Sequence, residues 1–355
     1  MPVRVGDIEL HVGPQEVGGP DDLRGAIVGF IDGAKKKLDI AVQELDSMDI
    51  AEAIVHARQR KVRVRLVVEG DYLKTEKVLA DPFQAGGKNE VNREIQNVIL
   101  RTAVDVRSDY NSKIFHQKFI VRDGSALLTG STNFTDTGTS TNLNHVVIVR
   151  SRKVANLYTR EYREIQQGHF GKLNEGHDEK PADVTVSNVP IRVLFAPDHN
   201  PEMEIMKQMM KSRSRIDFAM FTFARSSGID DTMITLCKDA GREIRGVLDN
   251  RQANQDWAAT KGLVGAGVKL WTATPKNGLR KLHHKLMVID EQVVIAGSFN
   301  YTGPATQLND ENIIILGDLE ITKKSTINAQ KKLATYALDE IDRIITKFGK
   351  RAKKG

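Results

Sequence analysis

Residues 116–133 read HQKFIVRDGSALLTGSTN, and residues 283–300 read HHKLMVIDEQVVIAGSFN. Both stretches place His-x-Lys, four residues, Asp, six residues and Gly-Ser-x-Asn in the same order. Every fixed position of the second stretch lies 167 residues after its counterpart in the first. An internal repeat with a period of this size predicts two copies of one domain in a single chain.

The repeat extends upstream of these two stretches. Residues 36–45 (KKLDIAVQEL) match residues 214–223 (SRIDFAMFTF), and both have the apolar pattern of a β-strand. In each half, a helix-like run and a second strand-like run follow. Strands that alternate with helices predict an α/β fold for both halves. Two such halves that face each other across a pseudo-twofold axis would bring both motifs into one cleft.

The chain length of 355 residues suits two domains. The region around residues 168–183 is rich in glycine and charge and has little periodicity, so we expect it to join the halves. We therefore predict an N-terminal half, a linker, a C-terminal half, and a basic helix with a tail. Their limits are residues 1–170, 171–187, 188–320 and 321–355.

The composition excludes several classes of protein. The single cysteine, Cys237, rules out an internal disulfide framework and a cysteine-rich metal site. The chain has no apolar run of the roughly 18 residues that a membrane helix needs, and its N-terminus does not read as a signal peptide. We therefore expect no stable membrane insertion and a cytoplasmic location.

The charge of the chain is unevenly distributed. The net charge is +6, whereas residues 321–355 contain ten Lys or Arg and three Asp or Glu, a net charge of +7. We expect this segment to be a packed amphipathic helix with a solvated basic end. The alternative is a sequence-independent contact with nucleic-acid phosphates or with an anionic membrane.

The two motifs place polar residues on particular faces of their strands. Side chains two residues apart in a strand share a face, so His116 lies beside Lys118 and His283 beside Lys285. The aspartates fall on the opposite face, and we expect them to hold a turn or a partner strand. The glycines allow close approach of the backbone to a ligand, and the Ser and Asn residues offer hydrogen bonds. These residues are Asp123, Asp290, Gly130, Gly297, Ser131, Asn133, Ser298 and Asn300.

Two such sets of residues around one point suit an anion with several oxygens, and a phosphodiester fits best. The lysines would neutralise the non-bridging oxygens, and the Ser and Asn side chains would orient them. One neutral imidazole would attack phosphorus, while the other, kept protonated, would give its proton to the leaving oxygen. The attack would form a covalent phosphohistidine that water then cleaves. We expect no metal or other cofactor, because the two lysines supply the positive charge.

The residue 28 positions after each motif histidine differs between the halves, being Asn144 in the first and Glu311 in the second. If this position lies behind the imidazole of its own half, Glu311 would hold His283 and favour its charged form. Asn144 would then orient His116 without favouring charge. This arrangement predicts His116 as the nucleophile and His283 as the proton donor. The alternative is that Glu311 raises the nucleophilicity of His283.

The doubled His-x-Lys-x4-Asp-x6-Gly-Ser-x-Asn pattern resembles that of the phospholipase D superfamily, and the resemblance covers both halves. It implies two tandem α/β/α-sandwich domains, one active site at their interface, and a phosphohistidine intermediate. One chain would supply the whole site, so a monomer would suffice, and the sequence identifies no regulatory partner. Asn144 departs from the family, which often has an acidic residue there, and this leaves open which histidine attacks first. The motif match implies catalytic or phosphate-binding roles for His116, Lys118, Asn133, His283, Lys285 and Asn300.

Several residues beside the motifs are candidates for the walls of the cleft. Tyr301 directly follows the second motif, and His145 and His284 are also adjacent to motif positions. Basic residues precede both histidines, and they suit a polyanionic substrate, with solvated loop charges as an equal alternative. These basic residues are Lys113, Arg280 and Lys281.

The superfamily acts on phospholipids and on nucleic acids, so the resemblance implies a chemistry without a substrate. The basic residues and the stretch around residues 193–223, which is similar to bacterial nuclease members, favour nucleic acid. We therefore predict a metal-independent endonuclease that cleaves DNA or RNA, with DNA favoured. The alternatives are a phospholipase D or phosphatidyl transferase that acts on phospholipids, and a catalytically inactive nucleic-acid-binding module.

Overall fold

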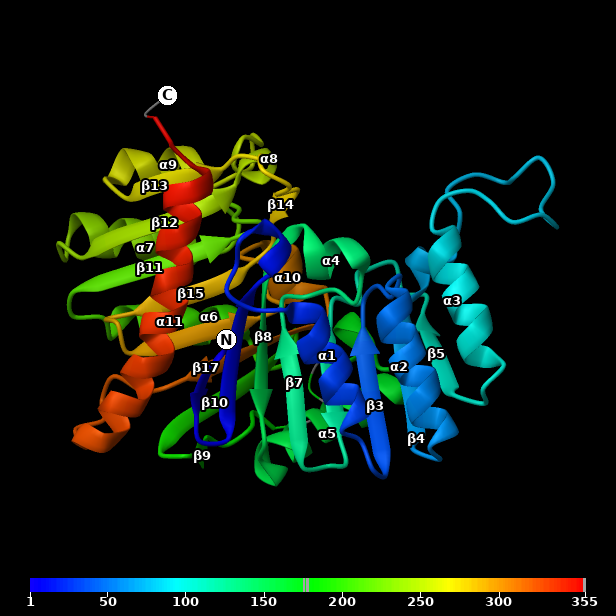
Figure 1. The fold of residues 1–355 in the computed structure, drawn as a ribbon. Helices are drawn as coiled ribbons and strands as arrows, with labels where there is room; N and C mark the ends of the chain where they lie inside the picture. Colours follow the sequence, from blue (N-terminus) through cyan, green and yellow to red (C-terminus); the bar gives the residue numbers. More distant parts are fainter. Residues whose placement is uncertain (175, 177–178, 354–355) are drawn as a thin grey trace.

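Two mixed β-sheets, one built mainly from each half of the chain, form the framework of the protein (Figure 1). The computed structural model describes residues 1–174, 176 and 179–353. The strand order of the first sheet is β1-β2-β8-β7-β6-β3-β4-β5, and β14 from the second half pairs with β8. The strand order of the second sheet is β18-β13-β12-β11-β15-β16-β17-β10-β9.

Corresponding elements follow one another in the same order in the two halves. The first sheet contains β1 (Val3–Val5), β2 (Ile8–Gly13), β3 (Lys37–Val42), β4 (Arg63–Glu69), β5 (Asp105–Asp109), β6 (Lys118–Arg122), β7 (Ala126–Gly130), β8 (Asn142–Val149) and β14 (Lys281–Leu282). The second contains β9 (Val184–Val186), β10 (Val189–Ala196), β11 (Arg215–Met220), β12 (Glu243–Asp249), β13 (Lys269–Ala273), β15 (Lys285–Ile289), β16 (Val293–Gly297), β17 (Glu311–Leu316) and β18 (Gly349–Arg351). Each motif lysine therefore begins a strand, and each motif glycine ends the next one.

Helices connect these strands. The α-helices are α1 (Leu23–Asp32), α2 (Met48–Gln59), α3 (Glu90–Leu100), α4 (Asp136–Ser140), α5 (Arg152–Gln166), α6 (Pro201–Met210), α7 (Ile229–Lys238), α8 (Asn250–Ala253), α9 (Thr260–Ala266), α10 (Gly303–Gln307) and α11 (Lys324–Phe348). Short 3-10 helices are η1 (Gln15–Val17), η2 (Gly70–Leu73) and η3 (Gly171–Leu173). No helix among the described residues combines the length and apolar character needed to cross a membrane.

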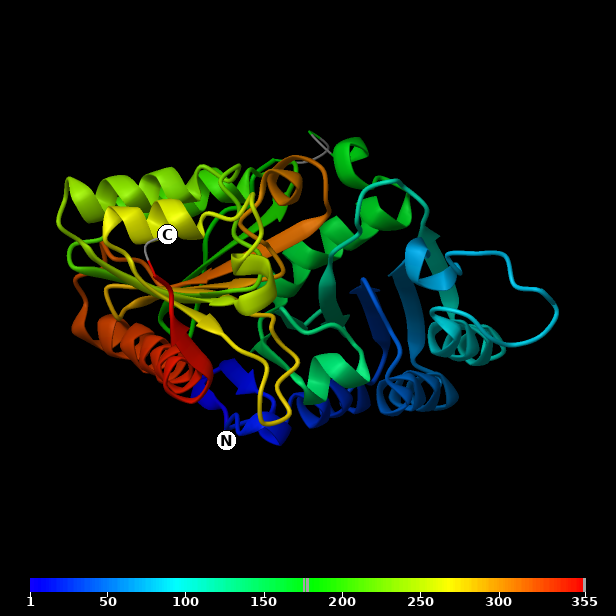
Figure 2. The ribbon, with the colours of Figure 1, turned by 90° about the horizontal axis from the view of Figure 1, so that it is seen from above.

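Helices cover both faces of each sheet (Figure 2). The apolar sides of α1, α2 and α3 form one core with the first sheet. Those of α6, α7 and α9 form a second core with the other sheet. A third core joins both sheets to α5 and α11, and it includes Phe119, Phe195 and Ile341. The structure thus confirms the predicted pair of α/β/α sandwiches that face each other.

The local pairing repeats between the halves. Val42 of β3 lies opposite Lys118 of β6, and Met220 of β11 lies opposite Lys285 of β15. After each motif, a threonine caps a short helix, because its side-chain oxygen accepts a hydrogen bond from a backbone N–H three residues on. The repeated sequence therefore produces the same strand pairing and the same turn on both sides of the pseudo-twofold axis.

The ends of the second half differ from the predicted segments. Strand β9 begins at Val184, inside the predicted linker, and pairs with β10. The basic end of the chain is not only a solvated tail, because residues 349–351 form β18 and pair with β13 after α11 ends. Residues 175, 177, 178, 354 and 355, which belong to these two predicted segments, lie outside the described residues.

The motif aspartates fasten β6 and β15 to neighbouring segments. Asp123 accepts hydrogen bonds from the backbone N–H groups of residues 35–37 at 2.7–2.9 Å. Asp290 accepts from those of residues 213–215 at 2.6–2.9 Å. Each aspartate thus ties the turn after its motif strand to the start of a neighbouring strand.

The end of β16 is expected to tolerate no side chain at Gly297. This residue has a φ of +138°, and an added Cβ would lie 2.3 Å from the carbonyl oxygen of Asn312. We expect Gly297→Ala to lower the free energy of unfolding by about 1–3 kcal/mol, measured by urea denaturation. Gly29 is the control, because it is exposed in α1 with open space around an added Cβ. Gly29→Ala should stabilise by about 0.5–1 kcal/mol, so equal effects of the two changes would contradict this account.

Candidate active site

Each motif histidine is anchored to the opposite half of the chain. The N–H of His116 donates to the carbonyl oxygen of Asp310 at 3.0 Å, and the N–H of His283 donates to that of Leu143 at 2.8 Å. Asp310 and Leu143 occupy equivalent positions in the repeat. The two halves therefore exchange the same backbone contact, and β14 leads His283 into place by pairing with β8.

A pocket of about 580 Å³ lies at this boundary. His116 and Asn133 of the first half line it together with His283 and Asn300 of the second. The structure thus brings the two motifs into one pocket, as the repeat predicts.

The side chains behind the histidines also come from the opposite half. Oε2 of Glu311 lies 2.6 Å from Nδ1 of His116, and Oδ1 of Asn144 lies 2.9 Å from Nδ1 of His283. The predicted pairing of Glu311 with His283 and of Asn144 with His116 is therefore wrong. Glu311 begins β17, and Asn144 lies near the start of β8. These ends face the other half across the interface, which the spacing within one half does not reveal.

Burial governs the protonation of the His116–Glu311 pair. Both side chains are almost completely buried. Burial raises the pKa of Glu311 to about 8, although the charges of Lys118 and Lys285 oppose this shift. Burial, followed by the charges of the same lysines, lowers the pKa of His116 well below its ordinary value. The hydrogen bond thus joins two groups that both resist charging. The charges of Lys118 and Lys285 favour the ionised carboxylate, and in that state Nδ1 of His116 donates to Glu311 and Nε2 is unprotonated.

His283 has an uncharged partner in Asn144. Oδ1 of Asn144 can only accept, so the proton of a neutral His283 is assigned to Nδ1, and Nε2 is the atom available for chemistry. Nδ2 of Asn144 donates to the carbonyl oxygen of Gly138 at 2.8 Å, which fixes the orientation of the amide. Burial, and then the charge of Lys285, lowers the pKa of His283 well below its ordinary value.

The motif lysines lie buried beside the histidines. Each ammonium group donates to the carbonyl oxygen of the histidine two residues before it, at 2.7 Å for Lys118 and 2.9 Å for Lys285. Lys118 also donates to Gln43 at 3.2 Å, whereas Nζ of Lys285 lies 5.0 Å from the ring centroid of Phe221. Burial lowers the pKa of Lys118 to about 7 and that of Lys285 well below its ordinary value. An anion in the pocket would restore the charged forms.

The motif serines do not face the pocket, so the prediction that they orient the phosphate is wrong. The hydroxyl of Ser131 donates to Oδ1 of Asn144 at 2.8 Å, and that of Ser298 donates to Oε2 of Glu311 at 2.6 Å. The glycine before each serine brings the strand end close to another strand rather than to a ligand. An added Cβ at Gly130, for example, would lie 2.3 Å from a carbonyl oxygen of β8. The serines therefore orient Asn144 and Glu311, which in turn hold the histidines.

The motif asparagines line the pocket, as predicted. Oδ1 of Asn133 and Oδ1 of Asn300 are buried without a hydrogen-bond partner among the described residues. Nδ2 of Asn133 lies 3.5 Å from Oε2 of Glu44. These amides make fewer hydrogen bonds within the protein than the serines do, so they are the better candidates for contact with a substrate.

Four pocket residues that the motifs did not indicate follow the strands paired with β6 and β15. Gln43 and Glu44 follow β3, and Phe221 and Thr222 follow β11. The two pairs occupy equivalent positions in the match between residues 36–45 and 214–223, so the repeat itself could have indicated them. Their chemistry differs, because one side of the pocket is polar and acidic where the other is aromatic.

Further apolar and aromatic side chains complete the pocket wall. Ile114 and Tyr72 come from the first half, and Phe221 and Trp257 come from the second. Ile114 is 46% exposed and Trp257 is 42% exposed, so both present apolar surface at the pocket. No regular spacing links these residues in the sequence, and only the fold brings them together.

The predicted substrate contacts have different outcomes. Lys281 lines the pocket. Lys113 and Arg280 are exposed in the segments that lead to the two histidines. Tyr301 is only 2% exposed and packs edge-on against Phe223, with ring centroids 5.1 Å apart. Its predicted place in the cleft is wrong, because a β-bridge to Phe223 holds this residue in the core.

His145 and His284 also lie outside the cleft, where they form a buried link between the halves. Their Nδ1 atoms lie 3.2 Å apart, and their rings are stacked. The N–H of Gly297 donates to Nε2 of His145 at 3.1 Å, so the proton of neutral His145 is assigned to Nδ1 and donated to His284. Nε2 of His284 then donates to Oε1 of Glu340 at 3.2 Å.

The equivalent positions of the repeat carry uncharged amides. Nδ2 of Asn312 donates to Oε1 of Gln117 at 2.7 Å, and Nε2 of Gln117 lies 3.4 Å from Glu161 of α5. The same connection between the halves is thus made by a histidine pair on one side of the axis and by an Asn–Gln pair on the other.

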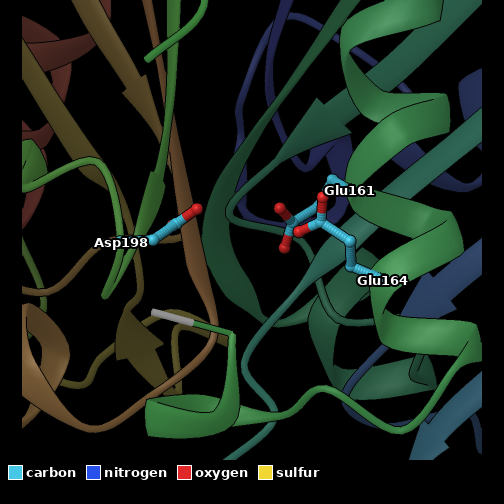
Figure 3. Close-up of side chains that lie close together, drawn as sticks. All are labelled: Glu161, Glu164 and Asp198. Carbon is cyan, nitrogen blue, oxygen red and sulfur yellow. The ribbon is translucent and has the colours of Figure 1, made fainter. Parts of the chain in front are cut away.

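Glu161 belongs to a cluster of three carboxylates with Glu164 and Asp198, whose oxygens lie within 4.8 Å of one another (Figure 3). Glu161 is buried and accepts from Gln117 and Asn174 at 3.4 and 3.3 Å. Carboxylates gathered in this way do not by themselves specify a metal site. The cluster lies behind Gln117, and none of its members lines the pocket of the two histidines.

Two His-x-Lys motifs that meet in one pocket across a pseudo-twofold interface define an enzyme of the phosphodiesterase type in the phospholipase D superfamily. The family described as "Cardiolipin synthase, PLD-like domain" matches residues 27–166 and 205–331. These ranges include most of both halves, and the chain belongs to this family.

Individual proteins show more limited similarity. Mitochondrial cardiolipin hydrolase from Xenopus tropicalis is 29% identical over 134 residues, which cover 38% of this chain and 56% of that protein. Phospholipase D from Rickettsia bellii (strain RML369-C) is 26% identical over 144 residues, which cover 38% of this chain and 65% of that protein. This chain therefore spans less than two thirds of the length of either relative.

Among solved structures, phosphatidylserine synthase from Haemophilus influenzae Rd KW20 superposes with a TM-score of 0.68. The match covers 99% of this chain and 88% of that chain at 12% sequence identity. At this identity the likeness shows a common fold over both halves, and the activity of the solved protein does not follow from it.

Acid is expected to destabilise the fold through the buried histidine link. Burial lowers the pKa of His145 and of His284. Below the unfolded-state value near 6.5, the unfolded chain therefore binds protons that the folded chain does not. The stabilisation is complete above about pH 7, and below pH 6.5 the free energy of unfolding should fall by up to about 1.4 kcal/mol per pH unit for each histidine. Urea denaturation at several pH values measures this slope.

The double variant His145→Asn/His284→Gln is the sharpest test of this assignment, because it copies the pair found at the equivalent positions. Its unfolding free energy should depend less steeply on pH than that of the wild type. His56→Asn is the control, because His56 is exposed on α2. A double variant with the wild-type slope would show that other groups cause the acid sensitivity.

Proposed function

We propose that this enzyme hydrolyses the phosphodiester between a phosphatidyl group and its head-group alcohol. One observation carries the proposal: His116 and His283 line a single pocket whose wall includes apolar side chains from both halves. The names of the two relatives, a cardiolipin hydrolase and a phospholipase D, support a phospholipid substrate. This proposal takes the alternative reading of the sequence, because the comparisons do not specifically support a nuclease.

We assign His116 as the nucleophile. Attack by its Nε2 on phosphorus makes the imidazole cationic, and the carboxylate of Glu311 at 2.6 Å from Nδ1 stabilises that charge. The role is the one predicted for His116, but its physical basis is a carboxylate from the opposite half. Asn144 supplies no such charge to His283, which suits His283 to proton transfer.

The proposed reaction proceeds in two steps. The negative charge of a bound phosphate raises the pKa of His283 and so favours its protonated form. As the bond from Nε2 of His116 to phosphorus forms, the P–O bond to the head group breaks, and protonated His283 gives its Nε2 proton to the leaving oxygen. Water then attacks phosphorus, His283 takes a proton from this water, and the P–N bond breaks. The products are phosphatidic acid and the free head-group alcohol.

The positive charge at the phosphate is assigned to Lys118 and Lys285. Burial disfavours their charged forms, and a bound phosphate opposes this effect by Coulombic attraction. With two ammonium groups in place, the proposed reaction requires no metal ion, so it is expected to proceed in excess EDTA.

A nuclease is the second candidate, and a basic hollow of about 390 Å³ favours it. Asp256 and Ala258 border this hollow, while Trp257 between them lines the catalytic pocket. A nucleic-acid strand cleaved at the histidines would pass Trp257, on which a base can stack, and reach these cations. The basic residues of the hollow are Lys261, Lys350, Arg351 and Lys353.

Turnover of lipid and of nucleic acid in excess EDTA distinguishes the two candidates. The wild type is incubated with vesicles that contain phosphatidylethanolamine, phosphatidylglycerol or cardiolipin, and separately with plasmid DNA, single-stranded DNA and RNA. We expect head-group release from vesicles, with a loss of about a thousandfold or more in His116→Ala and in His283→Ala. Cleavage of nucleic acid without any lipid turnover would overturn the phospholipid proposal and establish the nuclease.

A trapped intermediate identifies the nucleophile. With bis(4-nitrophenyl) phosphate, the leaving group needs little help from an acid, so His283→Ala should still form the bond between His116 and phosphorus. Attack releases one 4-nitrophenolate. The variant lacks the base for the second step and should accumulate histidine at position 116 that carries the remaining 4-nitrophenyl phosphoryl group, detected by mass spectrometry of peptides. The same group on the histidine at position 283 in His116→Ala, with none at position 116 in His283→Ala, would reverse the assignment.

A further inference from the structure

Glu44 is an acidic residue in the wall of a pocket whose lysines suit an anion. Its Oε2 lies 3.5 Å from Nδ2 of Asn133, and it has no ion pair within 4.0 Å among the residues that the structure describes. A carboxylate beside a bound phosphate repels it, because like charges at short range in a partly buried site interact strongly. The charges of Lys281, Lys118 and Arg280 act on it from a distance, so a positive group of the ligand could pair with it directly.

The acidic charge is confined to one side of the pocket. The equivalent position of the repeat is Thr222, so the fold itself does not require an acid there. Beside Glu44, Nε2 of Gln43 lies 3.3 Å from the hydroxyl of Tyr72, and both residues line the pocket. The opposite side presents Phe221. One wall is therefore polar and anionic, and the other is aromatic.

We propose that Glu44 binds a protonated amine in the head group of the substrate. This inference rests on the proposed function, in which the head-group alcohol leaves from this pocket. Asn133, a candidate phosphate contact, lies next to Glu44, so a ligand that reaches both residues needs its cation close to its phosphate. An aminoethyl ester has this form. Lys118 and Lys285 then match the phosphate, and Glu44 matches the amine.

The groups around Glu44 define the pH range in which it carries its charge. Burial raises its pKa to about 7, and Asp46 adds to this shift. The charges of Lys281, Lys118 and Arg280 oppose it. Tyr72 also interacts with it electrostatically, and His116 and His283 line the same pocket. The carboxylate is therefore ionised above about pH 7, and a preference for an amine should weaken as the pH falls below this value.

Binding of two small phosphodiesters tests the proposal without a lipid. Diethyl phosphate and 2-aminoethyl ethyl phosphate differ only in the amine, and their dissociation constants can be measured by calorimetry at pH 8. We expect the wild type to bind the amine ester about tenfold more tightly, as for a charge-assisted hydrogen bond. Glu44→Gln should bind the two esters with affinities within about twofold of each other, because it keeps the shape of the side chain without its charge. Glu52→Gln, an exposed change on α2, is the matched control and should keep the preference.

Each outcome decides the proposal. A wild type that does not distinguish the two esters overturns it, and so does a Glu44→Gln variant that keeps the wild-type preference. A further outcome is that the wild type prefers the amine ester, that the preference is lost in Glu44→Gln, and yet that no head group is released from vesicles. This result supports the role of Glu44. In that case the phospholipid substrate is wrong, and the two failures are thus distinguishable.

Discussion

The active site depends on an exchange of contacts between the two halves of the chain. Each motif histidine receives its side-chain partner and its backbone hydrogen bond from the opposite half. Neither half by itself holds an imidazole in place. The core that joins both sheets to α5 and α11 therefore stabilises the fold and also sets the geometry of the site. It also dehydrates the histidines and lysines, which shifts their pKa values toward the uncharged forms.

Chemical differences are superimposed on this symmetric framework, and they lie close to the histidines. Glu311 stands where the other half has Asn144, so one imidazole has an ionisable partner and the other does not. Glu44 stands where the other half has Thr222, so one wall carries charge. The backbone can remain symmetric because each change replaces one hydrogen-bonding side chain with another. Symmetry thus sets where groups lie, and a few substitutions set which of them can hold a charge.

The fold and both motifs could be predicted from sequence because they rest on local patterns. Strand periodicity, the constant offset and the His-x-Lys spacing each act within a short segment. The pairing of Glu311 and the orientation of Ser298 could not be predicted, because they depend on which strand ends meet across the interface. Tyr301 was misplaced for a similar reason, since its β-bridge to Phe223 is a tertiary contact. Glu44 belongs to no motif, yet the repeat places it opposite Thr222 and could have drawn attention to it.

The joining of both halves in one polypeptide has a consequence for how long the site persists. Helix α11 packs against the second sheet and also contacts β1 of the first, so the chain closes on itself from both ends. Each half meets its complement at a high effective concentration that does not vary with the amount of protein. Dilution therefore cannot separate the two halves of the site, as it would separate two subunits. The lifetime of the catalytic geometry is instead set by the rate at which the shared core opens, which is a kinetic property of a single molecule.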